Sequence, residues 1–239
     1  MKGGINMVKV GIIGAMELEV ETLKKALHTT NRVQKAGMDF LEGRLNGANV
    51  VIVKSGIGKV NAALCVQILC DIFKVTHIIN TGVAGSLNPA LNIGDILVSR
   101  IAIHHDMDAT NFGYPLGEVP QLGIKEFKAD SDLAKLAEDT IKRELPGIGT
   151  LTGVVLSGDQ FIADDAVKAR LIENFHGDCC EMEGASIAHG AYLNGVPFVI
   201  LRAISDKADG TAQMDYPAFE TAAAENCAKL VKALVPKIR

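Results

Sequence analysis

The sequence predicts an α/β fold, a three-layer sandwich in which helices flank both faces of a central mixed β-sheet. Short apolar runs typical of buried strands alternate with helical patterns along the whole chain, which is the pattern of a protein built around one sheet. Segments 39–45 and 49–54 are separated only by a turn at Gly47, so they predict a hairpin whose antiparallel strands make the sheet mixed. The sequence contains no repeat, low-complexity tract or linker, so residues 1–239 are expected to form a single domain. Residues 1–6 are a candidate N-terminal extension, because Met7 offers a second start.

The first half of the chain should contribute most of the sheet. Gly11 to Ile13 belong to an apolar run that ends in a tight turn at Gly14, as expected for a buried strand. The expected elements are a strand at 8–13, a helix at 17–28, the hairpin strands at 39–45 and 49–54, a helix at 59–73, and strands at 77–81 and 94–103.

Glu19 is the unusual residue of the first expected helix. On the helical wheel it shares the apolar face with Leu23 and Leu27, although a carboxylate normally faces solvent. In the first turn it either complements the helix dipole or has a chemical role, and both interpretations stay open on this pattern. The solvated face consists of Glu17, Glu21, Lys24 and His28.

The loop that precedes the helix at 59–73 is rich in glycine. Residues 55–59, with the sequence SGIGK, match neither of the common phosphate-binding patterns, so a phosphate site is the less favoured interpretation. Apolar residues then recur every fourth position and predict the core face of the helix: Val60, Leu64, Ile68 and Ile72.

The second half of the chain alternates helices with strands after a turn-rich segment at 110–121. That segment carries Phe112, Tyr114 and Pro120. The expected elements are a helix at 129–145, a strand at 150–156, a helix at 163–175, a short strand opening at Cys179, a helix at 184–194, a strand at 197–204 and a final helix starting at 215–217. The stripe that should bury the final helix consists of Phe219, Ala223, Cys227, Leu230 and Leu234.

The composition narrows the functional classes. With 48% apolar and 22% charged residues, the chain is globular rather than disordered. The net charge of −4 without a Lys/Arg cluster argues against binding to nucleic acid or an anionic membrane. Five cysteines without a disulfide spacing, and no secretory signal, indicate reduced thiols in a cytoplasm.

No metal or other cofactor is expected. The cysteines form no CxxC pair, which argues against zinc. The cluster at 104–108, HHDMD, has the residue types of a metal site but not the ligand spacing of a helix, so a structural loop is favoured.

Several apolar strands end in polar or glycine-rich loops, and ligands in α/β sheets bind beyond the carboxyl ends of strands. Asp206 follows such a strand and either caps a turn or belongs to a site. Arg202, inside the same strand, requires a buried carboxylate partner. Together the loops predict a small apolar pocket with few carboxylates and almost no cations, which suits a neutral nucleoside. The strand ends are Gly14, Ser55, Gly82, Ser157, Glu181 and Ser205.

Six segments, in chain order, carry a resemblance to a known family. They are GIIGAMELEV, SGIGKVNAAL, NTGVAGSL, SGDQFI, EMEGASIAHG and VPFVILRAISDKAD. The chain resembles the 5′-methylthioadenosine/S-adenosylhomocysteine nucleosidases, a family of the purine nucleoside phosphorylase-like superfamily, over nearly its whole length. The resemblance implies hydrolysis of the N-glycosidic bond of 5′-substituted adenosines, release of adenine, a role in methionine salvage and a cytoplasmic homodimer. The segment with Phe112 would line the pocket of the partner.

The resemblance also implies roles for individual residues. Asp206 corresponds to the general acid that protonates N7 of adenine, and Glu19 to the residue that activates water. For Asp206 to hold a proton near neutrality, its pKa must rise about 3 units above ~3.9, which desolvation can cause. The expected substrate-binding residues are Gly85 at the floor, Phe161 stacked on the base, Ile162 at the adenine edge, Met182 beside the sugar, Glu183 at the ribose hydroxyls and Ser205 beside the acid.

Two other functions compete with hydrolysis. A nucleoside phosphorylase on the same fold would need cations for phosphate, but residues 11–19 contain no arginine and Glu19 would repel the anion. A non-catalytic nucleoside-binding domain would need the pocket but not both Glu19 and Asp206. Val83 and Tyr216 stand where some family members carry serine and phenylalanine, so the preference among methylthio, homocysteinyl, deoxy and aminodeoxyfutalosine substrates stays open.

Overall fold

The computed structural model describes residues 7–239, so the candidate extension at 1–6 lies outside the described residues. Up to its middle the chain forms β1 (Lys9–Gly14), α1 (Glu17–Ala26), β2 (His28–Lys35), β3 (Met38–Leu45), β4 (Ala48–Lys54), α2 (Lys59–Asp71), β5 (His77–Ser86), β6 (Ile96–His104) and a short 3-10 helix, η1 (Thr110–Phe112). It continues with β7 (Phe127–Lys128), α3 (Ser131–Glu144), β8 (Thr150–Ser157), α4 (Asp165–Phe175), β9 (Cys179–Glu181), α5 (Gly184–Asn194), β10 (Phe198–Asp206), α6 (Ala212–Leu234) and η2 (Val235–Lys237).

The strands form one mixed sheet, as predicted, with the order β10-β6-β8-β9-β5-β1-β4-β3-β2. Strands β4 and β5 lie on either side of β1 and run parallel to it, whereas β2, β3 and β4 form an antiparallel meander. Because β10 also pairs with β5, the strands β5, β10, β6, β8 and β9 close into a ring at one end of the sheet. The sheet is therefore open on the β2 side and barrel-like on the other.

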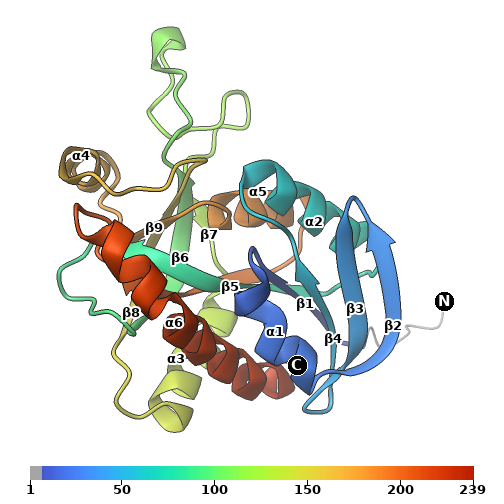
Figure 1. Ribbon diagram of the computed structural model, residues 1–239. Helices are drawn as coiled ribbons and strands as arrows, with labels where there is room; N and C mark the ends of the chain where they lie inside the picture. Colours follow the sequence, from blue (N-terminus) through green and yellow to red (C-terminus); the bar gives the residue numbers. More distant parts are fainter. Residues whose placement is uncertain (1–6) are drawn as a thin grey trace.

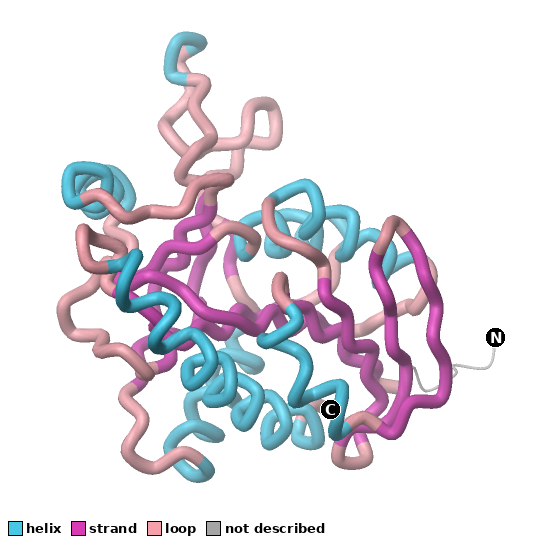
Figure 2. Tube along the Cα trace, in the orientation of Figure 1, coloured by secondary structure: helices cyan, strands magenta, loops and turns pink. Residues whose placement is uncertain are grey.

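Helices cover both faces of the sheet and complete the predicted three layers (Figures 1 and 2). On one face α1, α3 and α6 bury apolar side chains such as Leu23, Ile141 and Leu230 in a common core. On the other face α2 and α5 pack together through Val66, Leu69 and other small or branched side chains. The segment between β6 and β7 projects from this body and carries η1 at its tip (Figure 1).

Strand β2, which forms a hairpin with β3, was not predicted from the sequence. Helix α1 ends at Ala26, and His28 begins β2 instead of closing the helix. Among the described strands, β2 pairs with β3 alone, and Val33 is its one partly buried residue, so no apolar alternation marks the strand in the sequence. Its charged and polar side chains are those expected on an exposed edge strand.

The predicted core face of α2 is wrong. Val60, Leu64 and Ile72 are 71%, 47% and 48% exposed, whereas the buried residues of the helix are Ala62, Cys65, Val66 and Leu69. Close packing explains the choice, because a Cβ at Gly190 of α5 would lie only 3.0 Å from Val66 Cγ1. Val66 therefore packs directly against α5, and the apolar stripe of Val60, Leu64 and Ile72 is left on the surface.

The final helix also differs from the expectation. Helix α6 begins at Ala212, so that Asp215 and Pro217 lie inside it rather than at its start. The backbone N–H of Thr211 donates to Asp209 Oδ1 at 2.9 Å, which fixes the turn that precedes the helix. Phe219 is 42% exposed, while the other residues of the predicted stripe are buried.

In the chain from residue 7 to residue 239, no helix is both long and apolar enough to span a membrane.

Candidate active site

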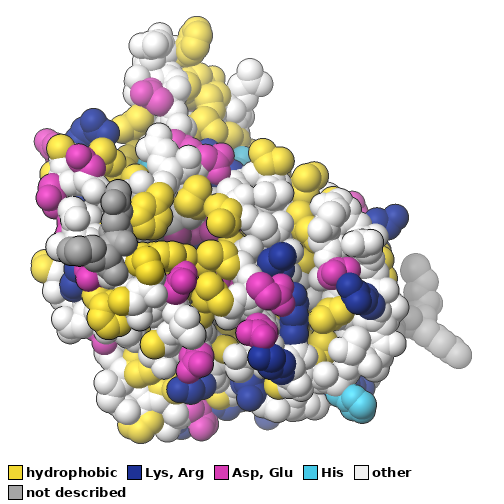
Figure 3. Space-filling model, in the orientation of Figure 1, with side chains coloured by type: hydrophobic (Ala, Val, Ile, Leu, Met, Phe, Trp, Pro, Cys, Tyr) yellow, Lys and Arg dark blue, Asp and Glu magenta, His cyan; other side chains and the backbone are white. Residues whose placement is uncertain are grey.

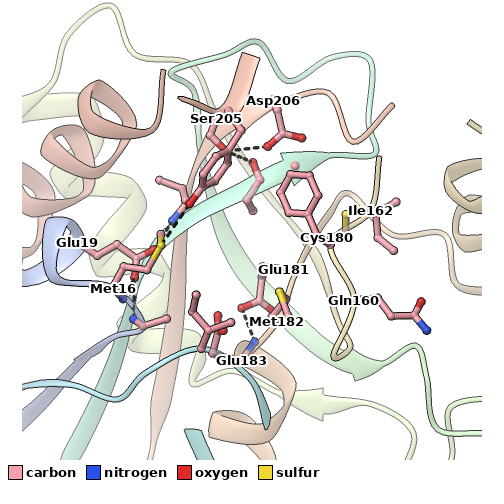
Figure 4. Close-up of a pocket in the computed structure, with 17 residues that line it drawn as sticks. Met16, Glu19, Gln160, Ile162, Cys180, Glu181, Met182, Glu183, Ser205 and Asp206 are labelled. Carbon is pink, nitrogen blue, oxygen red and sulfur yellow. Dashed lines mark hydrogen bonds between the residues drawn. The ribbon is translucent and has the colours of Figure 1, made fainter. Parts of the chain in front are cut away.

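A cavity of about 380 Å³ lies at the carboxyl ends of the central strands (Figure 4). In Figure 3, hydrophobic side chains border a hollow above α6. The lining includes all eight residues that the sequence analysis assigned to the site, which are Glu19, Gly85, Phe161, Ile162, Met182, Glu183, Ser205 and Asp206. Val83, Tyr216 and Ile57 also line it, whereas His104 and His105 do not.

Glu19 is held at the start of α1 by backbone amides. Its Oε2 accepts hydrogen bonds from the N–H groups of Ala15 at 2.6 Å and Met16 at 2.9 Å. Its Oε1 accepts one from Val83 at 3.0 Å, which ties α1 to β5. Burial raises the pKa of this carboxyl, and this effect exceeds the lowering by Arg202 and the three amides. Glu19 is therefore fixed in position and more basic than an exposed glutamate.

One buried guanidinium is shared by three carboxylates, which provides the partner that Arg202 was predicted to need. Its Nη2 contacts Glu181 directly and lies 3.7 Å from Glu183 Oε2, while Nη1 lies 4.0 Å from Glu19 Oε1. Nη2 also donates to Asn80 Oδ1 at 2.6 Å. Burial alone would lower the pKa of Arg202, but the three carboxylates raise it above its usual value. The cation therefore stays charged beneath the pocket.

Glu181 anchors this cluster to α5. It accepts hydrogen bonds from Ser157 Oγ and from the backbone N–H groups of Glu183 and Gly184, the latter two at 3.1 and 2.8 Å. Amides at a helix N-terminus favour an anion there. With its oxygens occupied in this way, Glu181 serves as a structural support for Glu183.

Glu183 is buried at the position before α5, and its Oε1 accepts a hydrogen bond from the Gly58 N–H at 2.9 Å. Burial, followed by repulsion from Glu181, raises the pKa of Glu183 to about 7, against the lowering effects of Arg202 and Gly58. Near neutral pH this side chain can therefore be present in either protonation state.

Asp206 is the last residue of β10 and is 2% exposed. Its Oδ2 accepts a hydrogen bond from Ser205 Oγ at 2.8 Å, and its Oδ1 accepts one from the Ala208 N–H at 2.8 Å. It therefore does cap a turn, but it also faces the pocket. Burial raises its pKa despite both hydrogen bonds. A Cβ at Gly85 would lie 2.7 Å from Asp206 Oδ1, so the absence of a side chain there leaves room for the carboxyl.

The aromatic wall of the pocket comes from α6 and the loop after β8. Phe161 and Tyr216 make an edge-to-face contact with ring centroids 5.6 Å apart, and Tyr216 Oη lies 3.3 Å from Met16 Sδ. Figure 4 shows Asp206 and Glu19 on different sides of the pocket. The two carboxyl groups can therefore act on different parts of one ligand.

Among the described residues, no lysine or arginine lines the cavity. Within 7–239, no group of three or more His, Cys, Asp or Glu side chains is placed to hold a metal ion. His104 and His105 are buried but do not line the cavity, and burial lowers the pKa of His104 to about 4. The cluster at 104–108 begins at the last residue of β6 and continues into the loop that follows it.

Some lining residues had no signal in the sequence. Met16 and Gln160 line the cavity from the segments after β1 and β8, and Cys180 lines it from β9. Gly82 was predicted only as a strand end at the pocket, yet a Cβ on it would collide with Arg202 and Glu19. The requirement for glycine there becomes visible only once β5, α1 and β10 are brought together.

The chain matches a family model described as the phosphorylase superfamily over residues 9–236. A 5′-methylthioadenosine/S-adenosylhomocysteine nucleosidase of an Exiguobacterium species is 42% identical over 232 residues, which are 97% of this chain and 99% of the relative. The crystal structure of such a nucleosidase from Colwellia psychrerythraea, in complex with adenine, is 39% identical with a TM-score of 0.93, covering 97% of this chain and 96% of that one. A futalosine hydrolase of Helicobacter pylori is 33% identical with a TM-score of 0.92 and covers 97% and 99% of the two chains. The chain therefore belongs to the 5′-methylthioadenosine/S-adenosylhomocysteine nucleosidases of the phosphorylase superfamily, and it is an N-glycosyl hydrolase.

Proposed function

We propose that this enzyme hydrolyses 5′-methylthioadenosine, S-adenosylhomocysteine and related 5′-substituted adenosines, with Asp206 as general acid and Glu19 as the group that activates water. The observation that carries the proposal is the pair of buried carboxyl groups with raised pKa values on different sides of one apolar cavity. Two carboxyl groups in distinct environments can divide acid and base roles.

Asp206 would act on the leaving group. Adenine departs as an anion unless one of its nitrogens is protonated, so an acid near N7 lowers the barrier. Burial favours the protonated form of Asp206, while Ser205 and the Ala208 amide fix its orientation. The carboxyl proton passes to N7 as the C1′–N9 bond breaks, which leaves Asp206 as a carboxylate.

Glu19 would act on the sugar. Three backbone amides hold it in position, and its raised pKa makes it a stronger base than an exposed glutamate. It takes a proton from the water that attacks C1′. The negative charge of the carboxylate also stabilises the oxocarbenium-like sugar that forms as the base departs.

The remaining predicted residues would bind the substrate between these two groups. Glu183 accepts hydrogen bonds from the ribose hydroxyls, and Met182 packs beside the sugar. Phe161 stacks on adenine, Ile162 offers its backbone to the adenine edge and Gly85 forms the floor. Their common position in the cavity lining supports these assignments.

A lining without cations favours water over phosphate as the nucleophile. A phosphate dianion at the sugar would lie beside Glu19, and the described lining offers no lysine or arginine to compensate its charge. Arg202 is already engaged by three carboxylates. Phosphorolysis is therefore the disfavoured reaction on this site.

A homodimer is part of the same proposal. Phe112 on the projecting segment is 85% exposed, and α2 presents Val60 and Leu64 to solvent. Exposed apolar side chains of this size are enriched at protein interfaces. We further propose a cytoplasmic enzyme that recycles by-products of S-adenosylmethionine chemistry, in keeping with five free cysteines, all within the described residues.

The test is an assay of adenine release from 5′-methylthioadenosine in phosphate-free buffer. We expect turnover without phosphate and a free sugar as the second product. A requirement for phosphate, with formation of a sugar 1-phosphate, would contradict the proposal. Comparing kcat/KM for the methylthio, homocysteinyl, deoxy and aminodeoxyfutalosine nucleosides would then rank the substrates.

A further inference from the structure

Three charged residues that do not line the cavity, Lys59, Asp106 and Asp159, form a network next to segments that do. Lys59 Nζ donates to Asp106 Oδ1 at 2.5 Å, and the backbone N–H of Asp159 donates to Asp106 Oδ2 at 3.1 Å. The backbone N–H of Lys59 donates to Asp159 Oδ1 at 2.9 Å. The network therefore connects the start of α2, the loop after β6 and the loop after β8.

Asp106 contacts two segments that also border the pocket, the loop at 55–59 and the loop at 158–162. Gly58, next to Lys59, donates its N–H to Glu183, and Ile57 lines the cavity. Asp159 is followed directly by Gln160 and Phe161, which line the cavity from another loop. One loop thus supports the proposed sugar end and the other the proposed base end.

The contact between the two loops leaves little freedom. Gly58 has a φ of +97°, and a Cβ there would lie 3.0 Å from Asp159 Oδ1. The side chains of Lys59 and Asp106 are each only 20% exposed, so this ion pair is better shielded than a surface pair. Burial would raise the pKa of Asp106, but the hydrogen bonds from Lys59 and the Asp159 amide lower it overall, so it is ionised at neutral pH.

We propose that Asp106 is a positioning residue that sets the spacing between the sugar-side loop at 55–59 and the base-side loop at 158–162. The inference rests on the proposed function, because it assigns the two loops to the two ends of a nucleoside. A nucleoside spans both loops and requires their correct separation. Free adenine contacts only the base side and does not.

The test compares two ligands with the full-length enzyme. Adenine reports the base side alone, and 5′-methylthioformycin reports both sides, because its carbon–carbon glycosidic bond cannot be hydrolysed. In Asp106→Ala we expect Kd for the formycin to rise about tenfold or more, while Kd for adenine changes less than about threefold. Asp106→Asn keeps an acceptor for the Asp159 amide and should recover part of the affinity.

Glu42→Ala is the matched control, since Glu42 pairs with Lys9 at 2.6 Å with similar exposure but lies outside the cavity lining. It should change neither Kd. Lys59→Met and Asp106→Ala should also be non-additive for the formycin, because each breaks the same contact. Equal weakening of both ligands, no weakening of either, or additive effects would overturn the positioning role. Both measurements are of binding, so failure of the hydrolase mechanism would appear separately in the turnover assay.

Discussion

At the residue scale, the site depends on how its acidic side chains are buried. Glu19 and Glu183 share Arg202 with Glu181, whereas Asp206 accepts hydrogen bonds from the Ser205 hydroxyl and the Ala208 amide. Burial is the main reason why the pKa of Glu183 is raised to about 7, and repulsion from Glu181 adds to it, while Arg202 lowers it.

The pKa of Glu183 makes stability depend on pH. Its value is raised from 4.5 to about 7 in the folded protein, so its contribution to stability is fully present below pH 4.5 and is lost as pH rises through 7. Glu183→Gln cannot ionise, so its stability relative to the wild type should increase between pH 5 and pH 8. The expected gain is on the order of 1 to 3 kcal/mol.

Urea unfolding of both proteins at the two pH values measures this difference. Glu42→Gln is the control: the pKa of Glu42 is lowered, chiefly by its hydrogen bond from Lys9 against a raising effect of burial, so it is already ionised throughout this range. A difference between Glu183→Gln and the wild type that stays constant from pH 5 to pH 8 would show that Glu183 does not titrate there.

At the element scale, α2 shows how packing decides which face of a helix is buried. Its large apolar residues at 60, 64 and 72 are exposed, while Ala62 and Cys65 are buried and Val66 lies against Gly190 of α5. The periodicity of a single helix cannot reveal this choice, because it depends on how closely the neighbouring helix approaches. Strand β2 could not be predicted either, because an edge strand that is exposed on both sides has no alternation of apolar and polar residues.

The exposed stripe of α2 leads to a prediction about assembly. Leu64→Glu places a charge in the middle of that stripe, and a charge buried without a partner in an interface is costly. We expect the variant to sediment as a monomer at concentrations where the wild type is a dimer. Its thermal stability as a monomer should stay close to that of a wild-type protomer, because Leu64 contributes little to the core of its own chain.

Lys25→Glu serves as the control, because it changes charge on the solvated face of α1, where the side chain is 71% exposed. It should leave the dimer intact. A wild-type protein that is already a fully active monomer at assay concentration would contradict the proposal, as would an intact dimer in Leu64→Glu.

At the scale of the whole molecule, the pocket lies where the sheet closes on itself. Strand β5 pairs with β10 and β9, which brings Gly85 beside Asp206 and close to Cys180. The N–H of Val83 then fixes Glu19, a residue nearly two hundred positions before Asp206 in the chain. Closure of the strands therefore assembles residues from distant parts of the sequence.

The sequence could predict the alternation of elements and the polar strand ends, because both leave local patterns. It could not predict that Arg202 is shared by three carboxylates. Nor could it predict that any side chain in place of Gly82 would collide with Arg202 and Glu19. Those features arise from distances between strands. The roles of Glu19 and Asp206 came from the resemblance, whereas their burial and their shared cavity are properties of the fold.

The central claim is the division of labour between Asp206 and Glu19. The most direct test compares kcat/KM of the wild type, Asp206→Asn and Glu19→Gln on two substrates, 5′-methylthioadenosine and the corresponding p-nitrophenyl 5-methylthioriboside. Nitrophenolate is stable as an anion and needs no proton to leave. Asp206→Asn should lose ~10²- to 10⁴-fold on the adenosine but only a few-fold on the aryl glycoside, whereas Glu19→Gln should be impaired on both. Equal impairment of Asp206→Asn on the two substrates, in a folded protein, would show that Asp206 is not the acid.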